Sequence, residues 1–311
     1  MNESTGTGQA VTTGLDDTAV GEATVDAAAT DTTLRTLVDD ILDLERIEEN
    51  IFRGRSPDDG MQRVFGGQVA AQAMVAASRT VSTDRSIHSL HSYFLRPGDP
   101  TIPIVYEVDR LRDGRSFATR RVVAIQHGKA IFVLSASYQV EEEGFDHQAA
   151  MPEVRPADEL VSYSLLHEGA KSPLTGADSP FDVRYDGDPR GYGGPGLGTN
   201  MWIRTSSSLP DDPLLHQTIL VYASDIALLR AVVNASGRPN ELLTQQQYAN
   251  VASLDHAVWF HRPCRMDEWM LYAQESPSSS GARGLATGSF FTADGVLAAS
   301  VVQEGLFRRR R

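Results

Sequence analysis

The sequence has one cysteine, Cys264, and no run that approaches the roughly 18 apolar residues of a membrane-spanning helix. A single cysteine cannot form an intrachain disulfide, which is typical of proteins in a reducing compartment. The N-terminus also lacks the basic segment and apolar core of a secretory signal. Together these absences predict a cytoplasmic protein that does not enter a membrane.

Positive charge is scarce as well. The chain has 28 Lys and Arg against 41 Asp and Glu, a formal net charge of −13. Proteins that bind nucleic acid or anionic membranes generally present a basic surface, so we expect neither partner. Residues 1–32 contain acidic residues, no Lys or Arg and almost no large apolar side chain. They cannot bury enough surface to offset chain entropy, and we predict a disordered tail.

The rest of the chain contains a long internal repeat. The residues that lead to Pro97 correspond to those that lead to Pro263, with an offset of 263 − 97 = 166. Upstream, 64–68 corresponds to 221–225. A repeat this long exceeds the solenoid units of about 20–50 residues and indicates two copies of a small domain. At the start of the copied helix the first copy has Gln68 and the second has Asp225, so the second copy is the candidate active site.

Each copy is predicted to contain a buried helix and several antiparallel strands. Small and apolar residues without proline predict a helix over 68–77, and a second helical pattern covers 212–235 with a break near Tyr222. A short helix is predicted over 33–45. Strands are predicted over 50–53, 87–95, 102–111, 116–125, 129–140, 181–184, 201–204, 252–260, 269–275, 284–291 and 296–303. Because each sheet alone would expose an edge strand, we expect the two sheets to join into one.

Taken together, the motifs resemble the acyl-CoA thioesterase II family, the double-hotdog thioesterases. The resemblance covers about residues 46–307. It implies an α+β fold of two tandem hotdog units, each with a curved antiparallel sheet wrapped around a long buried helix. We expect the units at 33–145 and 181–311, joined by a linker over 146–180. The motifs that carry the resemblance are 64–68, 91–99, 144–148, 222–225, 253–256, 259–263 and 294–305.

This resemblance also implies an activity. The family hydrolyses fatty acyl-CoA thioesters to free fatty acid and CoA with an Asp, a Ser or Thr, and a Gln, which would place the protein in fatty acid metabolism. Its pattern assigns these roles to Asp225, Ser253 and Gln303, with no metal, no other cofactor and no covalent acyl-enzyme. The expected partner is an acyl-CoA substrate, bound along the seam between the units. We also expect a homo-oligomer.

Each assigned residue has a structural alternative. At the start of the second helix, Asp225 would be kept ionised by free N–H groups and could act as a base, or it could only cap that helix. Ser253 opens a predicted strand, where a serine often bonds the backbone. Gln303 ends an apolar strand and could be a satisfied buried amide. In the catalytic interpretation these two side chains hold the attacking water beside the carboxylate.

The expected substrate-binding residues are Gly66, Gly67 and Gln68, at the start of the first buried helix. Backbone N–H groups at a helix start are suitable donors for the oxyanion that forms during thioester hydrolysis. Glycine also permits close backbone approach, so both glycines could instead serve helix–sheet packing.

The histidines could indicate a hydrolytic Asp–His pair or a zinc site, but their positions in the sequence favour neither. Asp255 and His256 are adjacent on a predicted strand, so their side chains point to opposite faces and do not readily share a site. His88, His91, His256 and His261 are therefore interpreted as packing or wall residues. No cluster of His, Cys, Asp and Glu has the spacing of a zinc site.

Two other functions remain open. A hotdog enoyl-CoA hydratase would need a paired Asp and His on one loop, and the sequence around Asp225 offers no such pair. A non-catalytic acyl-CoA binding module would bind the same ligand without turnover. Release of free CoA thiol separates a thioesterase from both alternatives.

Overall fold

The computed structural model describes residues 1, 32–57, 60–166, 179–187, 199–236 and 248–309. Its strands form one antiparallel sheet of thirteen strands, in the order β1-β2-β4-β5-β6-β3-β10-β13-β12-β11-β8-β7, with β9 paired to β13 off this path. Nearly all of the predicted disordered tail lies outside the described residues. Within the described ranges, no helix has the length and apolarity needed to span a bilayer.

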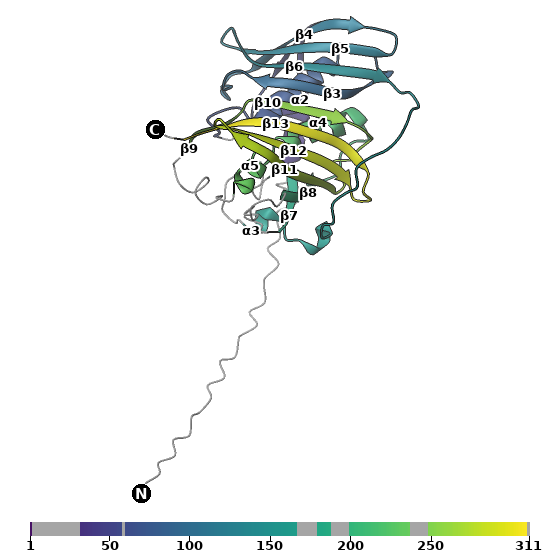
Figure 1. The fold of residues 1–311 in the computed structure, drawn as a ribbon. Coiled ribbons are helices and arrows are strands. Elements are labelled where there is room, and N and C mark those ends of the chain that lie inside the picture. The colour runs from purple at the N-terminus through teal and green to yellow at the C-terminus, as the bar shows by residue number, and fades with distance from the viewer. Residues whose placement is uncertain (2–31, 58–59, 167–178, 188–198, 237–247, 310–311) are drawn as a thin grey trace.

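The first half forms one side of this sheet, drawn in blue to teal in Figure 1. The predicted strands are present, and an additional strand, β1, forms a hairpin with β2. The predicted first helix is present over residues 32–42, and most of it is a π-helix. The elements are η1 (Thr36–Leu42), β1 (Glu45–Glu48), β2 (Ile51–Gly54), α2 (Gly66–Ser78), β3 (Arg85–Phe94), β4 (Ile104–Asp113), β5 (Phe117–Gln126) and β6 (Lys129–Val140).

The second half repeats this plan. The predicted strand over 252–260 is two strands, β9 and β10, separated at Leu254, and β13 is longer than predicted. Two short helices, η2 (Ala157–Glu159) and α3 (Tyr163–Leu166), lie between the halves. The remaining elements are β7 (Phe181–Asp186), β8 (Thr199–Thr205), α4 (Pro213–Ser224), α5 (Arg230–Ala235), β9 (Tyr248–Ser253), β10 (Asp255–Phe260), β11 (Met270–Ser280), β12 (Arg283–Thr292) and β13 (Leu297–Arg309).

The two halves join through β3 and β10, which confirms the predicted continuous sheet. His91 on β3 lies opposite Ala257 on β10, and 257 − 91 = 166 is the offset found in the sequence repeat. A strand meets its own copy in this way only at a twofold axis. The β3–β10 pair therefore marks a pseudo-twofold axis that relates the two copies.

Helix α2 is buried on nearly all sides, as predicted. Seven of its thirteen residues are glycine or alanine, which lets the surrounding chain approach closely. The approach is tightest at Gly67, where a Cβ atom would lie 2.4 Å from the Tyr222 carbonyl oxygen at the end of α4. The start of α2 and the end of α4 therefore meet. Figure 1 shows the two helices behind the sheet where its two halves join.

Candidate active site

Asp225 does not open a helix, contrary to prediction. It is the C-cap of α4 and lies between α4 and α5. The following residues, 226–229, have a helical pattern in the sequence, but Ala227 adopts φ 62° and the helix is interrupted there. The sequence predicts that Asp225 accepts hydrogen bonds from N–H groups at the start of its own helix. These groups are not its donors in the structure.

A different helix start supplies the hydrogen bond instead. The Gly67 N–H in the first turn of α2 donates to Asp225 Oδ2 at 2.9 Å. The N-cap residue of α2, Phe65, makes no side-chain capping bond, so the carboxylate from the second half takes that function. Its position at a helix N-terminus favours the ionised form. Asp225 thus links the two halves at the point where α2 and α4 meet.

Gln303 connects Asp225 to Ser253. Its Nε2 donates to Asp225 Oδ1 at 2.6 Å and to Ser253 Oγ at 2.8 Å. The Gln303 side chain is fully buried. Three residues from distant parts of the second half therefore form one hydrogen-bonded group, and an amide holds a carboxylate and a hydroxyl within reach of each other.

Strand pairing explains how Ser253 and Gln303 come together. Ser253 ends β9, whereas the prediction had it open a strand, and Gln303 lies inside β13, whereas the prediction had it end one. β9 pairs with the extension of β13, with Ser253 opposite Gly305. Gln303 is two residues before Gly305, so the side chains of Gln303 and Ser253 point to the same face of the sheet.

Burial sets the protonation of Asp225. It raises the pKa of this carboxyl to about 6, against the hydrogen bonds from Gln303 and Gly67, which lower it. Desolvation disfavours the charged form, whereas donors to the carboxylate favour it. The group is therefore poised close to neutral pH, where a carboxylate can both accept and return a proton.

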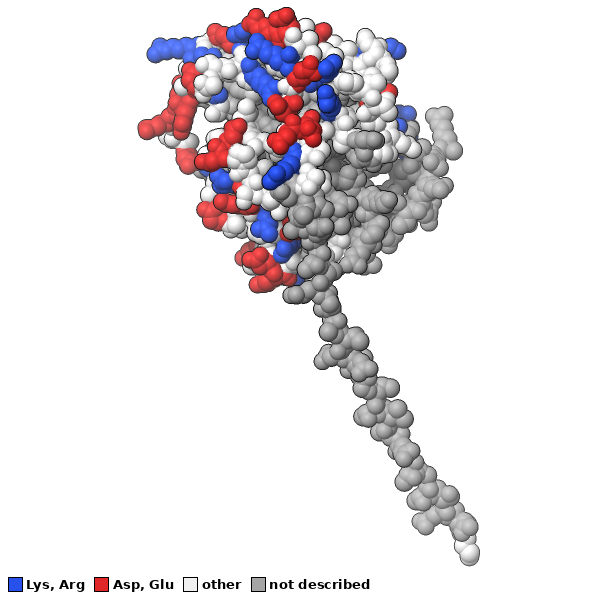
Figure 2. All heavy atoms as spheres, turned by 180° about the vertical axis from the view of Figure 1, so that it is seen from behind, with Lys and Arg blue, Asp and Glu red and all other residues white. Residues whose placement is uncertain are grey.

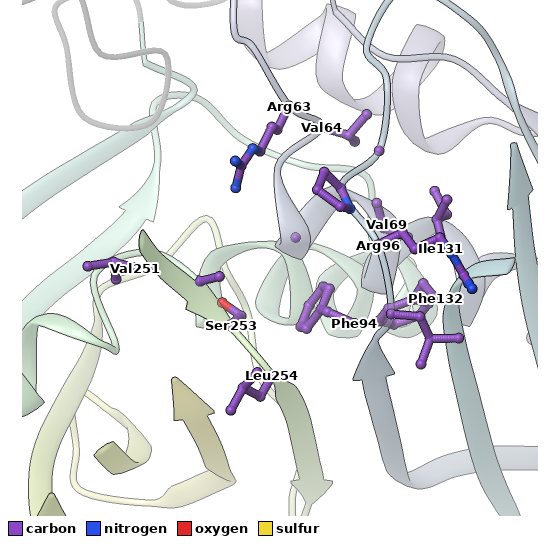
Figure 3. Close-up of a pocket in the computed structure, with 15 residues that line it drawn as sticks. Arg63, Val64, Val69, Phe94, Arg96, Ile131, Phe132, Val251, Ser253 and Leu254 are labelled. Carbon is purple, nitrogen blue, oxygen red and sulfur yellow. The ribbon is translucent and has the colours of Figure 1, made fainter. Parts of the chain in front are cut away.

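A pocket of about 360 Å³ opens at the seam beside this group. Figure 3 shows Ser253 and Leu254 on one side and Phe94, Ile131 and Phe132 on the other. Phe94 and Phe132 pack with ring centroids 5.0 Å apart and form an apolar wall. The pocket is lined by Arg63, Val64, Gly66, Val69, Phe94, Leu95, Arg96, Pro97, Gly98, Ile131, Phe132, Val251, Ala252, Ser253 and Leu254.

The three predicted substrate-binding residues have different positions. Gly66 lines the pocket, and a Cβ atom there would lie 2.7 Å from Asp225 Oδ2. Gly67 is buried and holds Asp225. Gln68 does not line the pocket: its Nε2 donates to the Arg55 carbonyl and to Ser56 Oγ. Of the three, Gly66 is the one that faces the pocket.

None of His88, His91, His256 and His261 lines the pocket. His88 bonds Ser137, and His261 bonds Ser300. His256 is fully buried and its Nε2 lies 2.7 Å from Ser224 Oγ, whereas the half-buried Asp255 accepts the Glu304 N–H. Asp255 and His256 thus face different partners, as strand geometry requires. Among the described residues, no three metal-ligating side chains gather in one place.

Charged side chains of both signs lie on the surface of the protein. On the face shown in Figure 2, basic and acidic residues lie interspersed. Several form ion pairs there or elsewhere on the surface, such as Arg53 with Glu45 and Arg283 with Glu304. Exposed pairs of this kind contribute little to stability.

Comparisons with known proteins agree with this architecture. Residues 176–306 match the acyl-CoA thioesterase family model, and residues 55–139 match the acyl-CoA thioesterase N-terminal domain. Acyl-CoA thioesterase 2 of Haemophilus influenzae is 42% identical over 279 residues, which cover 86% of this chain and 96% of that protein. Human acyl-coenzyme A thioesterase 8 is 37% identical over 289 residues, 88% of this chain and 89% of that protein.

Solved structures show the same fold. An acyl-CoA thioesterase II from Mycobacterium marinum is 44% identical, with a TM-score of 0.75 over 88% of this chain and 98% of that chain. A hotdog-fold protein from Alicyclobacillus acidocaldarius is 20% identical, with a TM-score of 0.69 over 88% of this chain and 98% of that chain, and supports the fold alone. The predicted double hotdog is confirmed, and the chain belongs to the acyl-CoA thioesterase II family.

Proposed function

We propose that the protein hydrolyses acyl-CoA thioesters with a water molecule that Asp225 activates, assisted by Ser253 and Gln303. The observation that carries this proposal is the Gln303 amide, which bridges the carboxylate and the hydroxyl beside the seam pocket. The names of the similar proteins support the same reaction. Its test is release of CoA thiol from a panel of acyl-CoA substrates, followed with a thiol reagent.

The chemistry follows from the hydrogen bonds. An ionised Asp225 takes a proton from water as the water oxygen attacks the thioester carbonyl carbon. Ser253 forms part of the pocket wall and accepts a bond from Gln303, so its own hydroxyl hydrogen is available to orient the water or the substrate. When the C–S bond breaks, the proton held by Asp225 passes to the CoA thiolate, and the carboxylate is restored.

The pocket suits both ends of the substrate. The rings of Phe94 and Phe132 form an apolar wall for the acyl chain. Arg63 and Arg96 also line the pocket and provide positive charge for the phosphates of CoA. With the Gly67 N–H already bonded to Asp225, we place the developing oxyanion near Gly66 at the open start of α2.

The pseudo-twofold axis gives a second position for this site, but the first half lacks the chemistry. His91 and Ala257 are equivalent positions in the two copies. Val302 lies opposite Ala257 and Ser135 lies opposite His91, so Val302 is equivalent to Ser135 and Gln303 is equivalent to Ala136. The same register matches Ser253 with Ile87. With Gln68 in place of Asp225, the first half carries no carboxylate, no hydroxyl and no bridging amide at these positions. We infer one working site per chain.

Titration with a non-hydrolysable acyl-CoA analogue tests this number. We expect one tight site per chain, because only the second half contains the hydrogen-bonded group. Gln68→Ala is expected to change substrate affinity or stability modestly while turnover persists, since Gln68 bonds Arg55 and Ser56 rather than the site. Two equivalent sites, or loss of turnover in Gln68→Ala, would contradict a single site.

The pH profile provides an independent measurement. Asp225 must be ionised to accept a proton, and its pKa is about 6. We therefore expect kcat/KM to be lost as the pH falls through about 6 and to be nearly constant above pH 7, until another group titrates. An acid limb near pH 4, the range of an ordinary carboxyl, would contradict a base whose pKa is raised by burial.

The alternative functions have less support. None of the described residues that line the pocket is a histidine, so the acid–base pair of a hydratase is not formed there. A binding module would have no need for a buried carboxylate bonded by an amide.

We further propose that the protein acts in the cytoplasm as a homo-oligomer. Its mass in solution, measured by light scattering, tests the second of these.

A further inference from the structure

Two buried side chains hold the residue that precedes Asp225. His256 on β10 bonds Ser224 Oγ at 2.7 Å, and the Tyr272 hydroxyl on β11 donates to the Ser224 carbonyl oxygen at 2.7 Å. Ser224 is the last residue of α4 and is fully buried. The end of this helix is thus attached to two separate strands of the sheet.

The direction of these bonds can be assigned. Ser224 Oγ donates its single hydrogen to the Val221 carbonyl at 2.8 Å, so His256 Nε2 carries the hydrogen and donates to Ser224 Oγ. His256 Nδ1 then accepts no bond from a described residue. An unpaired buried acceptor is more common than an unpaired buried N–H, which supports this tautomer. His256 is therefore a neutral donor and not a proton carrier.

The duplication shows that the histidine is particular to the second half. Strand register matches His256 with Leu90, which is also fully buried. The sequence repeat matches Ser224 with Gly67. A buried imidazole costs desolvation that leucine does not, so packing alone does not account for His256. The histidine and the serine occur together only in the half that carries Asp225.

Tyr272 is also fitted to its position. Its ring stacks on Phe290 with centroids 4.0 Å apart, and a Cβ atom at Gly288 would lie 2.4 Å from it. The register matches Tyr272 with Tyr106, since 272 − 106 = 166, but the Tyr106 hydroxyl bonds the Gln72 side chain. The same residue thus holds a side chain in one half and the backbone before Asp225 in the other.

We propose that His256 and Tyr272 are positioning residues that fix the end of α4 and thereby place Asp225 between Gln303 and Gly67. This inference rests on the proposed function, in which Asp225 is the base. Because the chain after Ser224 leaves the helix, nothing in regular helix geometry sets the direction of Asp225. The two side chains supply that constraint.

Among the residues that the structure describes, few other titratable groups face Asp225. It accepts hydrogen bonds from Gly67 on α2 and Gln303 on β13, and Gln303 in turn bonds Ser253 on β9; none of these residues titrates near neutral pH. From the remaining packed strands, the facing groups are His256, through Ser224, and Tyr272, whose pKa burial raises well above its usual value. If a substitution at Ser224, His256 or Tyr272 shifts the acid limb of the pH profile, the shift would therefore report displacement of Asp225 itself.

The test compares Tyr272→Phe and Ser224→Ala with Tyr106→Phe. Each tyrosine variant loses one buried hydroxyl, but Tyr106 bonds α2 of the first half and not the chain before Asp225. We expect Tyr272→Phe and Ser224→Ala to lower kcat by about 10- to 10²-fold, the scale for a displacement of about 1 Å, with KM little changed. We also expect their acid limb to move to higher pH as the bonds to Asp225 weaken. Tyr106→Phe should keep both values.

Two results would overturn the inference. The first is that Tyr272→Phe and Ser224→Ala have the same kcat and the same acid limb as Tyr106→Phe when all three variants lose a similar amount of melting temperature. The other is loss of kcat with an unmoved acid limb, which indicates general destabilisation. If Tyr272→Phe does not fold, Ser224→Ala decides alone, because it removes only one oxygen atom. Measuring Asp225→Asn in the same assay separates failure of this inference from failure of the proposed function.

Discussion

Replacing Asp225 with asparagine is expected to lower kcat by at least about 10²-fold, the scale for loss of a general base. Asparagine keeps the shape of the side chain and can still accept one of the bonds from Gln303 and Gly67. It cannot take a proton from water. We expect KM to change little, because the carboxylate acts on water rather than on the acyl chain or CoA.

Thermal unfolding distinguishes lost chemistry from lost structure in this variant. Burial raises the pKa of Asp225 to about 6, so the carboxylate is ionised at pH 7 in both the folded and the unfolded chain. Its charge is less favourable when buried, and this lowers the free energy of unfolding. Asparagine removes that cost and loses one hydrogen bond, and these effects oppose each other. We expect a melting temperature close to that of the parent. Near-normal turnover in a folded Asp225→Asn enzyme would show that another group is the base.

Gln303→Leu is expected to have the second largest effect. Leucine has a similar size but donates nothing, so Asp225 and Ser253 each lose their bond to the amide. We expect kcat to fall by about 10²-fold, the scale for removal of a preorganised donor. The pKa of Asp225 should rise, because one of its two donors is lost, and the acid limb of kcat/KM should move to higher pH.

Gln274→Leu is the matched control for this substitution. Gln274 is also a buried glutamine in a strand of the second half, on β11, but no described residue forms a hydrogen bond with either of its polar atoms. Replacing an unpaired buried polar group with an apolar one is close to neutral for stability or favourable. We expect Gln274→Leu to keep parental kcat and pH dependence. Equal loss of activity in both variants would mean that the Gln303 bonds have no special role.

Local patterns account for what could be predicted about the elements. The small apolar residues of 68–77 indicated a buried helix, and α2 is buried over nearly its whole length. The 166-residue offset between the copies reappears in the register of β3 and β10. The sequence also predicts a break near Tyr222 in the second helix, and α4 ends close to it, at Ser224. The apolar residues 226–229 fit a helix, and only the tertiary structure interrupts it.

The site itself depends on contacts that no local pattern encodes. Gly67 and Asp225 are 158 residues apart, and Asp225 and Gln303 are 78 apart. The sequence by itself determined the duplication, the residue types of the site and the family resemblance that selected them, because repeats and periodicity are properties of the chain. The tertiary structure decided that the carboxylate meets the helix start of the other half and that burial brings its pKa to about 6. Both depend on how the two copies pack, and packing is set by the whole fold.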